Sequence, residues 1–264
     1  AADAAAARLV VNPDAPDVGN NPGAYNDFWF EVAGIGDTVR TSLVVYPENG
    51  RFPAAVEGAP RQFGGLGPDV SGARPVRYTV GGIAKDGPED RGLSTRCIVG
   101  FNSGPPFTPS LYNNNVQIFQ SRNTAVIMTE MIHDARIVPL GDRPELDDDI
   151  RLWSGDSRGY WDGDTLVVET KNFNGLRQTF NSTGANGNMV LTERFTRVAY
   201  DTVNYEFTID DPSTFTDKIT AIVPMIKVGG LLYEYACHEG NYGMFNILRG
   251  ARVEERLVAE SGTQ

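Results

Sequence analysis

The two histidines of the chain, His133 and His238, both lie in short segments that are crowded with ionisable side chains. Glu130 and Asp134 flank the first, and Glu239 directly follows the second. Histidine titrates near neutral pH, and a neighbouring carboxylate fixes its tautomer and raises its basicity. The pattern therefore predicts two imidazole–carboxylate units, one acting as general base and the other as general acid.

The first histidine segment also carries a cation, Arg136, which we expect to stabilise a developing oxyanion. Along an expected strand Ala125–Ile137, alternation puts Arg136 and the two carboxylates on one face and His133 on the other. A bulge near the histidine would bring these groups together. The alternative is that Arg136 forms a salt bridge to Asp134 or Glu130, and that both imidazoles are ordinary strand residues.

Aromatic side chains are concentrated in and near the loop Gly100–Pro109, which is rich in glycine and proline. Such a loop predicts a rigid lip over an apolar pocket for a small organic ligand. The residues expected to contact this ligand are Phe101, Phe107, Tyr112, Trp153 and Tyr235.

The two histidine segments, although far apart in sequence, are expected to meet in space. Their other residues are mostly apolar or aromatic, and burying the polar groups separately would leave several unsatisfied, at about 1–3 kcal/mol each. One shared network satisfies them together. We therefore expect both imidazoles to border one partly apolar cavity beneath the loop Gly100–Pro109.

The two cysteines, Cys97 and Cys237, are expected to form a disulfide in an exported protein. On the chain-entropy model such a bridge is worth about 4–5 kcal/mol. The chain opens with AADAAAARLV and no Met, which is typical of a mature exported protein or of an arbitrary start. The alternative is a pair of buried thiols in a cytosolic core.

No metal site and no organic cofactor are predicted. The two histidines with one carboxylate could form a facial triad, but the spacings HxxxH, HxH and HExxH are absent. Neither cysteine lies in a CxxC pair, so a zinc site is not expected either. The serine in Gly155–Gly159 (GDSRG) lacks the strand-to-helix context of a nucleophile elbow.

Strand signals dominate the chain and predict an all-β, antiparallel fold. The expected strands are Thr41–Tyr46, Val116–Gln120, Ala125–Met131, Thr165–Thr170, Met189–Thr196, Thr202–Ile209 and Leu231–Cys237. Turns at Asp162-Gly163 and near Tyr200-Asp201 predict hairpins. The best helix candidate is Leu248–Ala259. We expect one domain over residues 1–264, a lipocalin-like closed or partly open barrel with an N-terminal arm over about 1–27; the alternative is a β-sandwich.

The formal net charge of −11 argues against nucleic acid and against anionic lipid surfaces as partners. No apolar run is long enough to cross a bilayer, so a membrane-spanning role is not expected. A small organic molecule is the expected partner, and a homo-oligomer stays open.

Four segments resemble a family of exported, largely uncharacterised proteins that are common in soil bacteria. They are Glu130–Leu140 (EMIHDARIVPL), Gly155–Thr170 (GDSRGYWDGDTLVVET), Asp210–Pro212 and Tyr233–Tyr242 (YEYACHEGNY). The resemblance spans about residues 20–255. It implies export, to the periplasm or outside the cell, and a domain like a β-barrel, but no particular reaction.

The first functional hypothesis is a lyase or isomerase that needs no organic cofactor and acts on a small, partly apolar substrate through the two histidines. The second is a lipocalin-like binding protein that holds an apolar small molecule without chemistry. A hydrolase is the third, weakened by the lack of a recognisable nucleophile. Fold alone does not decide between these classes.

Overall fold

The computed structural model describes residues 42–59, 68–72, 82–110, 113–176 and 187–262. Its largest sheet is antiparallel, with strand order β1 (Val44–Tyr46), β11 (Ile219–Ile226), β10 (Thr202–Asp210), β9 (Val190–Arg197), β8 (Thr165–Lys171) and β7 (Asp156–Asp162). A second antiparallel sheet holds β4 (Val116–Gln120), β5 (Thr124–Thr129) and β6 (Ala135–Pro139). A short parallel pair is formed by β2 (Asp69–Val70) and β3 (Gly82–Ile83).

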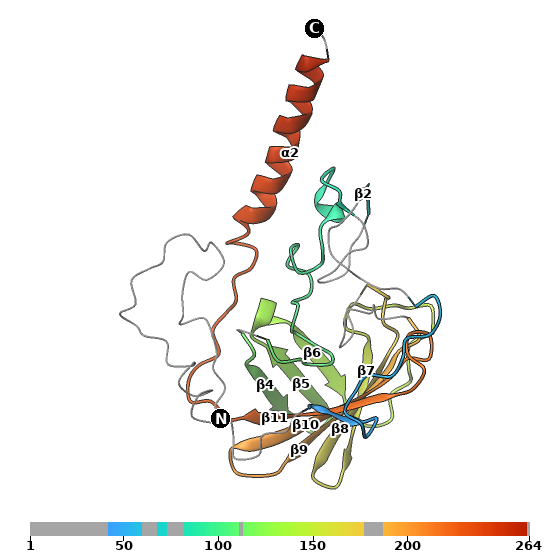
Figure 1. Ribbon diagram of the computed structural model, residues 1–264. Coiled ribbons are helices and arrows are strands. Elements are labelled where there is room, and N and C mark those ends of the chain that lie inside the picture. Colours follow the sequence, from blue (N-terminus) through green and yellow to red (C-terminus); the bar gives the residue numbers. More distant parts are fainter. Residues whose placement is uncertain (1–41, 60–67, 73–81, 111–112, 177–186, 263–264) are drawn as a thin grey trace, which may run out of the picture.

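The two larger sheets pack against each other around one hydrophobic core (Figure 1). Alternation along the strands decides which side chains enter it. In β10, Tyr205 and Phe207 are fully buried, whereas Asn204 and Glu206 are not. Both predicted hairpins are present, β7–β8 turning at Gly163 with φ of 59° and β9–β10 turning near Tyr200.

The sheets meet at Gly159 of β7, which forms an isolated parallel bridge with Leu140 just after β6. A Cβ at this glycine would lie 2.7 Å from Leu140 Cδ2 and 2.8 Å from Val138 Cγ1. The close approach therefore requires glycine. Among the described residues no ladder joins the outer strands β1 and β4. The all-β antiparallel prediction is confirmed; a closed lipocalin-like barrel is not found, and the packing is consistent with the sandwich alternative.

The expected single strand Ala125–Ile137 is wrong. β5 ends at Thr129, and a one-turn 3-10 helix, η3 (Met131–His133), leads into β6. Ile132 and His133 have φ of 60° and 45°, so the chain reverses here. The histidine therefore lies at the tip of a hairpin rather than on a bulged strand, and strand alternation does not govern where it points.

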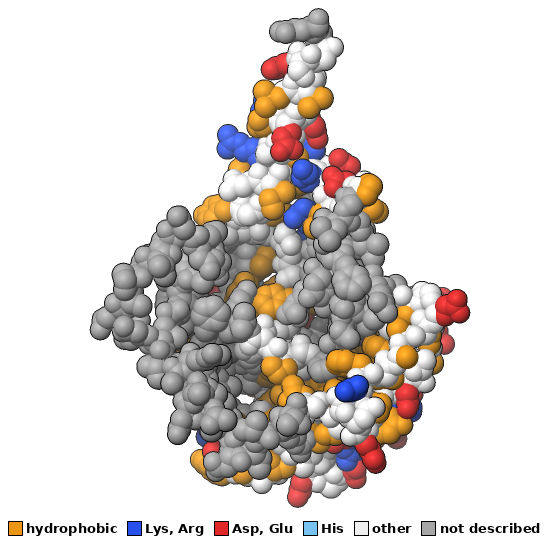
Figure 2. All heavy atoms as spheres, in the orientation of Figure 1, with side chains coloured by type: hydrophobic (Ala, Val, Ile, Leu, Met, Phe, Trp, Pro, Cys, Tyr) orange, Lys and Arg blue, Asp and Glu red, His pale blue; other side chains and the backbone are white. Residues whose placement is uncertain are grey.

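The expected strand Leu231–Cys237 is also wrong, because residues 227–241 form no strand. Leu231 and Tyr233 are 80% and 72% exposed, so no sheet covers them. This C-terminal segment leads to α2 (Tyr242–Ser261), which extends the predicted helix Leu248–Ala259 at both ends. The helix projects away from the sheets (Figure 1), and Figure 2 shows apolar and charged side chains mixed along it. Another 3-10 turn, η2 (Pro88–Asp90), follows β3.

Candidate functional site

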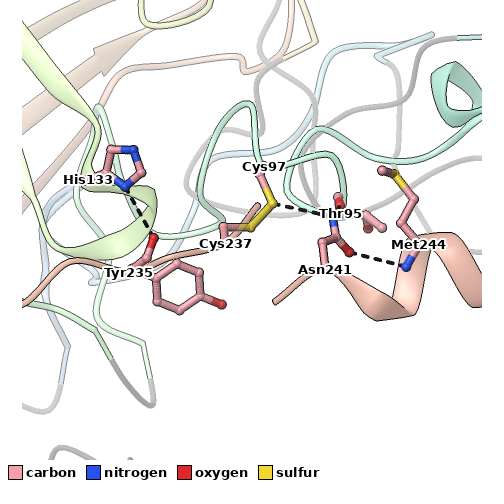
Figure 3. Close-up of a disulfide and its surroundings, with 7 residues drawn as sticks. All are labelled: Thr95, Cys97, His133, Tyr235, Cys237, Asn241 and Met244. Atoms are coloured by element: carbon pink, nitrogen blue, oxygen red, sulfur yellow. Dashed lines mark hydrogen bonds between the residues drawn. A yellow bond between two sulfur atoms is a disulfide. The ribbon is translucent and has the colours of Figure 1, made fainter. Parts of the chain in front are cut away.

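The predicted disulfide is confirmed: Cys97 and Cys237 are bonded, with their Cα atoms 5.8 Å apart (Figure 3). It attaches the C-terminal segment to the loop that precedes Gly100. Asn241, four residues after Cys237, donates from Nδ2 to the Thr95 carbonyl at 2.7 Å. The same side chain accepts from Met244 N at 3.3 Å and so caps the start of α2. The disulfide and the Asn241 side chain together attach both the C-terminal segment and the start of α2 to the loop around Thr95 and Cys97.

The two histidine segments meet, but through a backbone group. His133 Nδ1 lies 3.3 Å from the Tyr235 carbonyl oxygen (Figure 3). The His133 side chain is exposed, and so is that of His238. The backbone carbonyl of His238 accepts from Asn241 N at 3.3 Å, which belongs to the turn before α2.

The C-terminal segment (residues 227–241) borders a cavity of about 950 Å³, which we name the C-terminal cavity. Its wall combines the loop of the first cysteine, the approach to the β5–β6 turn, the C-terminal segment and the first turns of α2. The lining residues are Ser94, Thr95, Asn113, Glu130, Tyr233, Glu234, Tyr235, Ala236, Cys237, Gly240, Asn241, Gly243, Met244 and Ile247. Neither imidazole lines it, which differs from the expectation that both border one cavity.

The chemical character of the C-terminal cavity is mixed. Tyrosine, methionine and isoleucine side chains supply apolar and aromatic surface, and two carboxylates, Glu130 and Glu234, supply negative charge. Glu130 is half-buried and accepts from Asn115 Nδ2 at 2.9 Å, which fixes its position. The cavity can therefore contact both an apolar body and a donor or cationic group of a ligand.

Arg136 does not take part in this cavity, because its guanidinium is buried between the sheets. It makes a two-pronged salt bridge to Glu193 of β9, with Nη2 2.9 Å from Oε1 and Nη1 bonded to Oε2. Burial works against the charge, but the Glu193 carboxylate outweighs it and raises the pKa of Arg136 above its usual value. The expected partners, Asp134 and Glu130, are thus replaced by a carboxylate on the opposite sheet.

Tyr205 completes this interior network. Its hydroxyl donates to Glu193 Oε1 at 2.8 Å and accepts from Phe107 N at 3.1 Å. Burial raises the pKa of Tyr205 well above its usual value, and the negative charge of Glu193 adds to this. Sequence reasoning missed Glu193, although it occupies the buried parity of β9 between Leu191 and Phe195. A charged residue on an apolar face was the signal.

The remaining predicted site residues are dispersed. Phe107 is buried in the main core, its ring 5.3 Å from that of Tyr205, so the loop Gly100–Pro109 packs inward instead of forming a lip. None of its residues lines the C-terminal cavity. Phe101 packs against the small cluster of Leu93 and Val99. Of the others, Tyr235 lines the cavity, Trp153, Asp134 and Glu239 do not, and Tyr112 lies outside the described residues.

Within the described ranges, no group of three histidine, cysteine or acidic side chains could hold a metal ion. In the same ranges, no helix has the length and apolarity needed to cross a bilayer. No protein-family model, curated protein sequence or solved structure matches this chain. The resemblance of the four sequence segments to an exported family therefore stays a prediction.

Proposed function

We propose that the protein binds a small, partly apolar organic molecule in the C-terminal cavity. The observation that carries the proposal is the cavity itself: its volume of about 950 Å³ lies within the usual range for small-molecule sites. Its lining also fits this use, because aromatic and aliphatic surface is combined with a few fixed polar groups.

Preorganisation supports the same proposal. One wall is the C-terminal segment, which belongs to no sheet and would cost conformational entropy to order on binding. The bridge to Cys97, the Asn241 contacts and the His133–Tyr235 contact hold it before any ligand arrives. A cavity with a wall fixed in advance binds more tightly than one that must first be assembled.

Two glycines of α2 offer a matched test. An added Cβ meets no atom within 4 Å at Gly243 or at Gly250, yet only Gly243 lines the cavity. Gly243→Trp should occupy part of the cavity while slightly favouring the helix, since glycine is a poor helix former. Ligand-observed NMR against a library of small aromatic and aliphatic compounds should give hits that bind the parent and Gly250→Trp equally and that Gly243→Trp loses.

Equal binding of these hits by Gly243→Trp would contradict the proposed site. The proposal would also be contradicted if no two library hits competed with each other for binding, because compounds that share one site must displace one another. Circular dichroism of both variants shows whether α2 and the sheets are retained, so that a loss of binding is assigned to the cavity.

A second candidate function is the acid–base enzyme, a lyase or isomerase. This candidate is supported by two contacts: Glu130 lines the cavity, and His133 Nδ1 lies 3.3 Å from the carbonyl oxygen of Tyr235 in its wall. If the histidines act as acid and base, His133→Gln and His238→Gln should each lower turnover about 10²-fold with little change in melting temperature. Unchanged ligand binding by both variants, with no turnover of any hit, would exclude this candidate.

We also propose that the protein works in an oxidising compartment outside the cytosol, since disulfides persist there. Thiol titration of the natural protein, unfolded without reductant, should then find neither cysteine free. Two titratable thiols would contradict this location.

A further inference from the structure

We infer that the ligand of the C-terminal cavity is an organic cation, an ammonium group carried on an apolar or aromatic body. This inference rests on the proposed function, and it adds the charge and chemical class of the ligand. Among the described lining residues, the ionisable side chains apart from tyrosine are Glu130 and Glu234, both acidic. No lysine, arginine or histidine is among the described lining residues.

Carboxylates next to apolar surface favour a cationic partner for a physical reason. A charged group that loses water without gaining a counter-charge costs free energy, and a bound cation removes that cost. A neutral ligand of the same shape would dehydrate the half-buried Glu130 carboxylate without supplying a counter-charge. An anionic ligand would add repulsion to this cost.

The start of α2 also borders the cavity, and its partial positive charge acts in the opposite direction. A helix N-terminus is equivalent to roughly half an elementary charge. One of its backbone donors, Met244 N, is already bonded to Asn241 Oδ1. Among the described lining groups, the two carboxylates therefore outweigh the helix N-terminus.

The aromatic lining fits the same ligand class. Tyr233 and Tyr235 both line the cavity, and the electron-rich face of a tyrosine ring attracts ammonium groups at distances within about 6 Å. Met244 and Ile247 provide surface for the apolar body of the ligand. The formal net charge of −11 additionally raises the local concentration of cations and speeds their association.

The first experiment compares three probes of nearly the same shape and different charge. These are benzyltrimethylammonium, its neutral carbon analogue neopentylbenzene, and the anion phenylmethanesulfonate. Each is titrated into the full chain while backbone amide NMR signals of Tyr235, Gly240 and Gly243 are followed. We expect these signals to move with the cation at the lowest concentration, and added salt should weaken its binding because the attraction is electrostatic.

The second experiment removes the charges one at a time. Glu130→Gln and Glu234→Gln should each weaken benzyltrimethylammonium binding about fivefold while leaving neopentylbenzene unchanged, as expected for one partly screened charge at close range. Glu260→Gln is the matched control, because it makes the same change on the last turns of α2, away from the cavity. It should leave both probes unaffected.

The failures of the two proposals are distinguishable. If neopentylbenzene or the sulfonate moves the same signals at equal or lower concentration, or if both cavity variants bind the cation like Glu260→Gln, the charge inference is overturned and the cavity stands as a ligand site. If none of the three probes moves these signals in a parent protein whose Gly243→Trp variant also loses no library hit, the binding site itself is overturned.

Discussion

Two regions of this molecule place charged side chains beside apolar surface, and they treat the charge in opposite ways. Between the sheets, Glu193 and Tyr205 are fully buried, and the carboxylate is matched by the Arg136 guanidinium and the tyrosine hydroxyl. At the C-terminal cavity, Glu130 and Glu234 border open space with no cation among the described lining residues. The first region contains both its charge and its counter-charge, whereas in the second we propose that a cationic ligand supplies the counter-charge.

The same contrast holds for the backbone. Residues of β8, β9 and β10 have hydrogen-bonded neighbours on both sides, so local opening there breaks several bonds at once. The C-terminal segment belongs to no ladder and depends on a disulfide and a few side-chain contacts. The strands of the interior are therefore held by the hydrogen bonds of the sheet. The cavity wall is held by a disulfide and single side-chain contacts, each of which can be removed by mutation.

The largest expected effect comes from removing the link at the cavity wall. The double variant Cys97→Ser/Cys237→Ser releases a bridge between residues 140 positions apart, which on the chain-entropy model costs about 5 kcal/mol of unfolding free energy. Amide hydrogen exchange should accelerate first in residues 233–241, and urea denaturation measures the total loss. If exchange in this segment stays as slow as in the parent, the bridge is not what orders the wall.

Breaking the interior pair should have a similar but entirely global effect. Glu193→Gln leaves the Arg136 charge buried without its counter-charge, and we expect a loss of about 3–5 kcal/mol in urea denaturation. Glu206→Gln, which lies on the outer parity of the neighbouring strand β10, should change stability by about 0.5 kcal/mol or less.

A second variant tests whether the loss of stability comes from the unpaired charge. Arg136→Met/Glu193→Leu removes both charges and should recover most of the loss, since the penalty belongs to the unpaired ion. A double variant as unstable as Glu193→Gln would show that the pair contributes directly, against our interpretation.

Tyr205 gives a smaller effect with a defined dependence on pH. Because its pKa is raised in the folded state, the folded protein keeps the proton above pH 10 while the unfolded chain loses it. The stability linked to Tyr205 is therefore fully present below pH 10 and is lost as the pH rises beyond it. Tyr205→Phe should cost about 1–3 kcal/mol at neutral pH.

Above pH 10, the free energy of unfolding of the parent should fall more steeply with pH than that of Tyr205→Phe. The difference between the two curves isolates this residue, because the other tyrosines and the lysines are common to both proteins. Parallel curves would mean that the hydroxyl is not protected from ionisation.

The smallest expected effect is at the start of α2. Asn241→Ala removes the helix cap and the contact with Thr95, and should cost about 1 kcal/mol, seen as faster exchange in the first turn of α2. Asn241→Asp keeps an acceptor for the cap but removes the amide donor. It should therefore retain the helix signal and loosen only the link to the Thr95 carbonyl.

Local pattern predicted the sheets well wherever a strand has alternating residues and a recognisable turn. β4 matches its predicted bounds, and β8, β9 and β10 lie within one residue of theirs. β11 was not among the expected strands, and it contains Pro224, a residue that removes a backbone donor and is unusual inside a strand. Pro224 lies beyond the positions where β1 pairs with β11, so on that stretch β11 has only β10 as a described neighbour. The proline is tolerated for a reason that only the tertiary arrangement supplies.

The site shows the same limit. The disulfide was predictable because the chain has only two cysteines. The partner of Arg136 was not, because Glu193 lies 57 residues away and any of the nearby carboxylates could have matched the charge. The sequence 231–237 has the alternation of a strand, but no described strand pairs with it, so its tyrosines became the wall of a cavity instead.

The position of the two cysteines along the chain has one more consequence. Every strand from β4 to β11 lies between Cys97 and Cys237, whereas β1 and α2 lie outside. The bridge thus closes the part of the chain that holds β4 to β11 into a covalent ring. A protease that cuts one loop of this ring produces two fragments that migrate as a single species on a non-reducing gel and separate only when reductant is added. Cleavage between β1 and Cys97 releases a fragment under either condition.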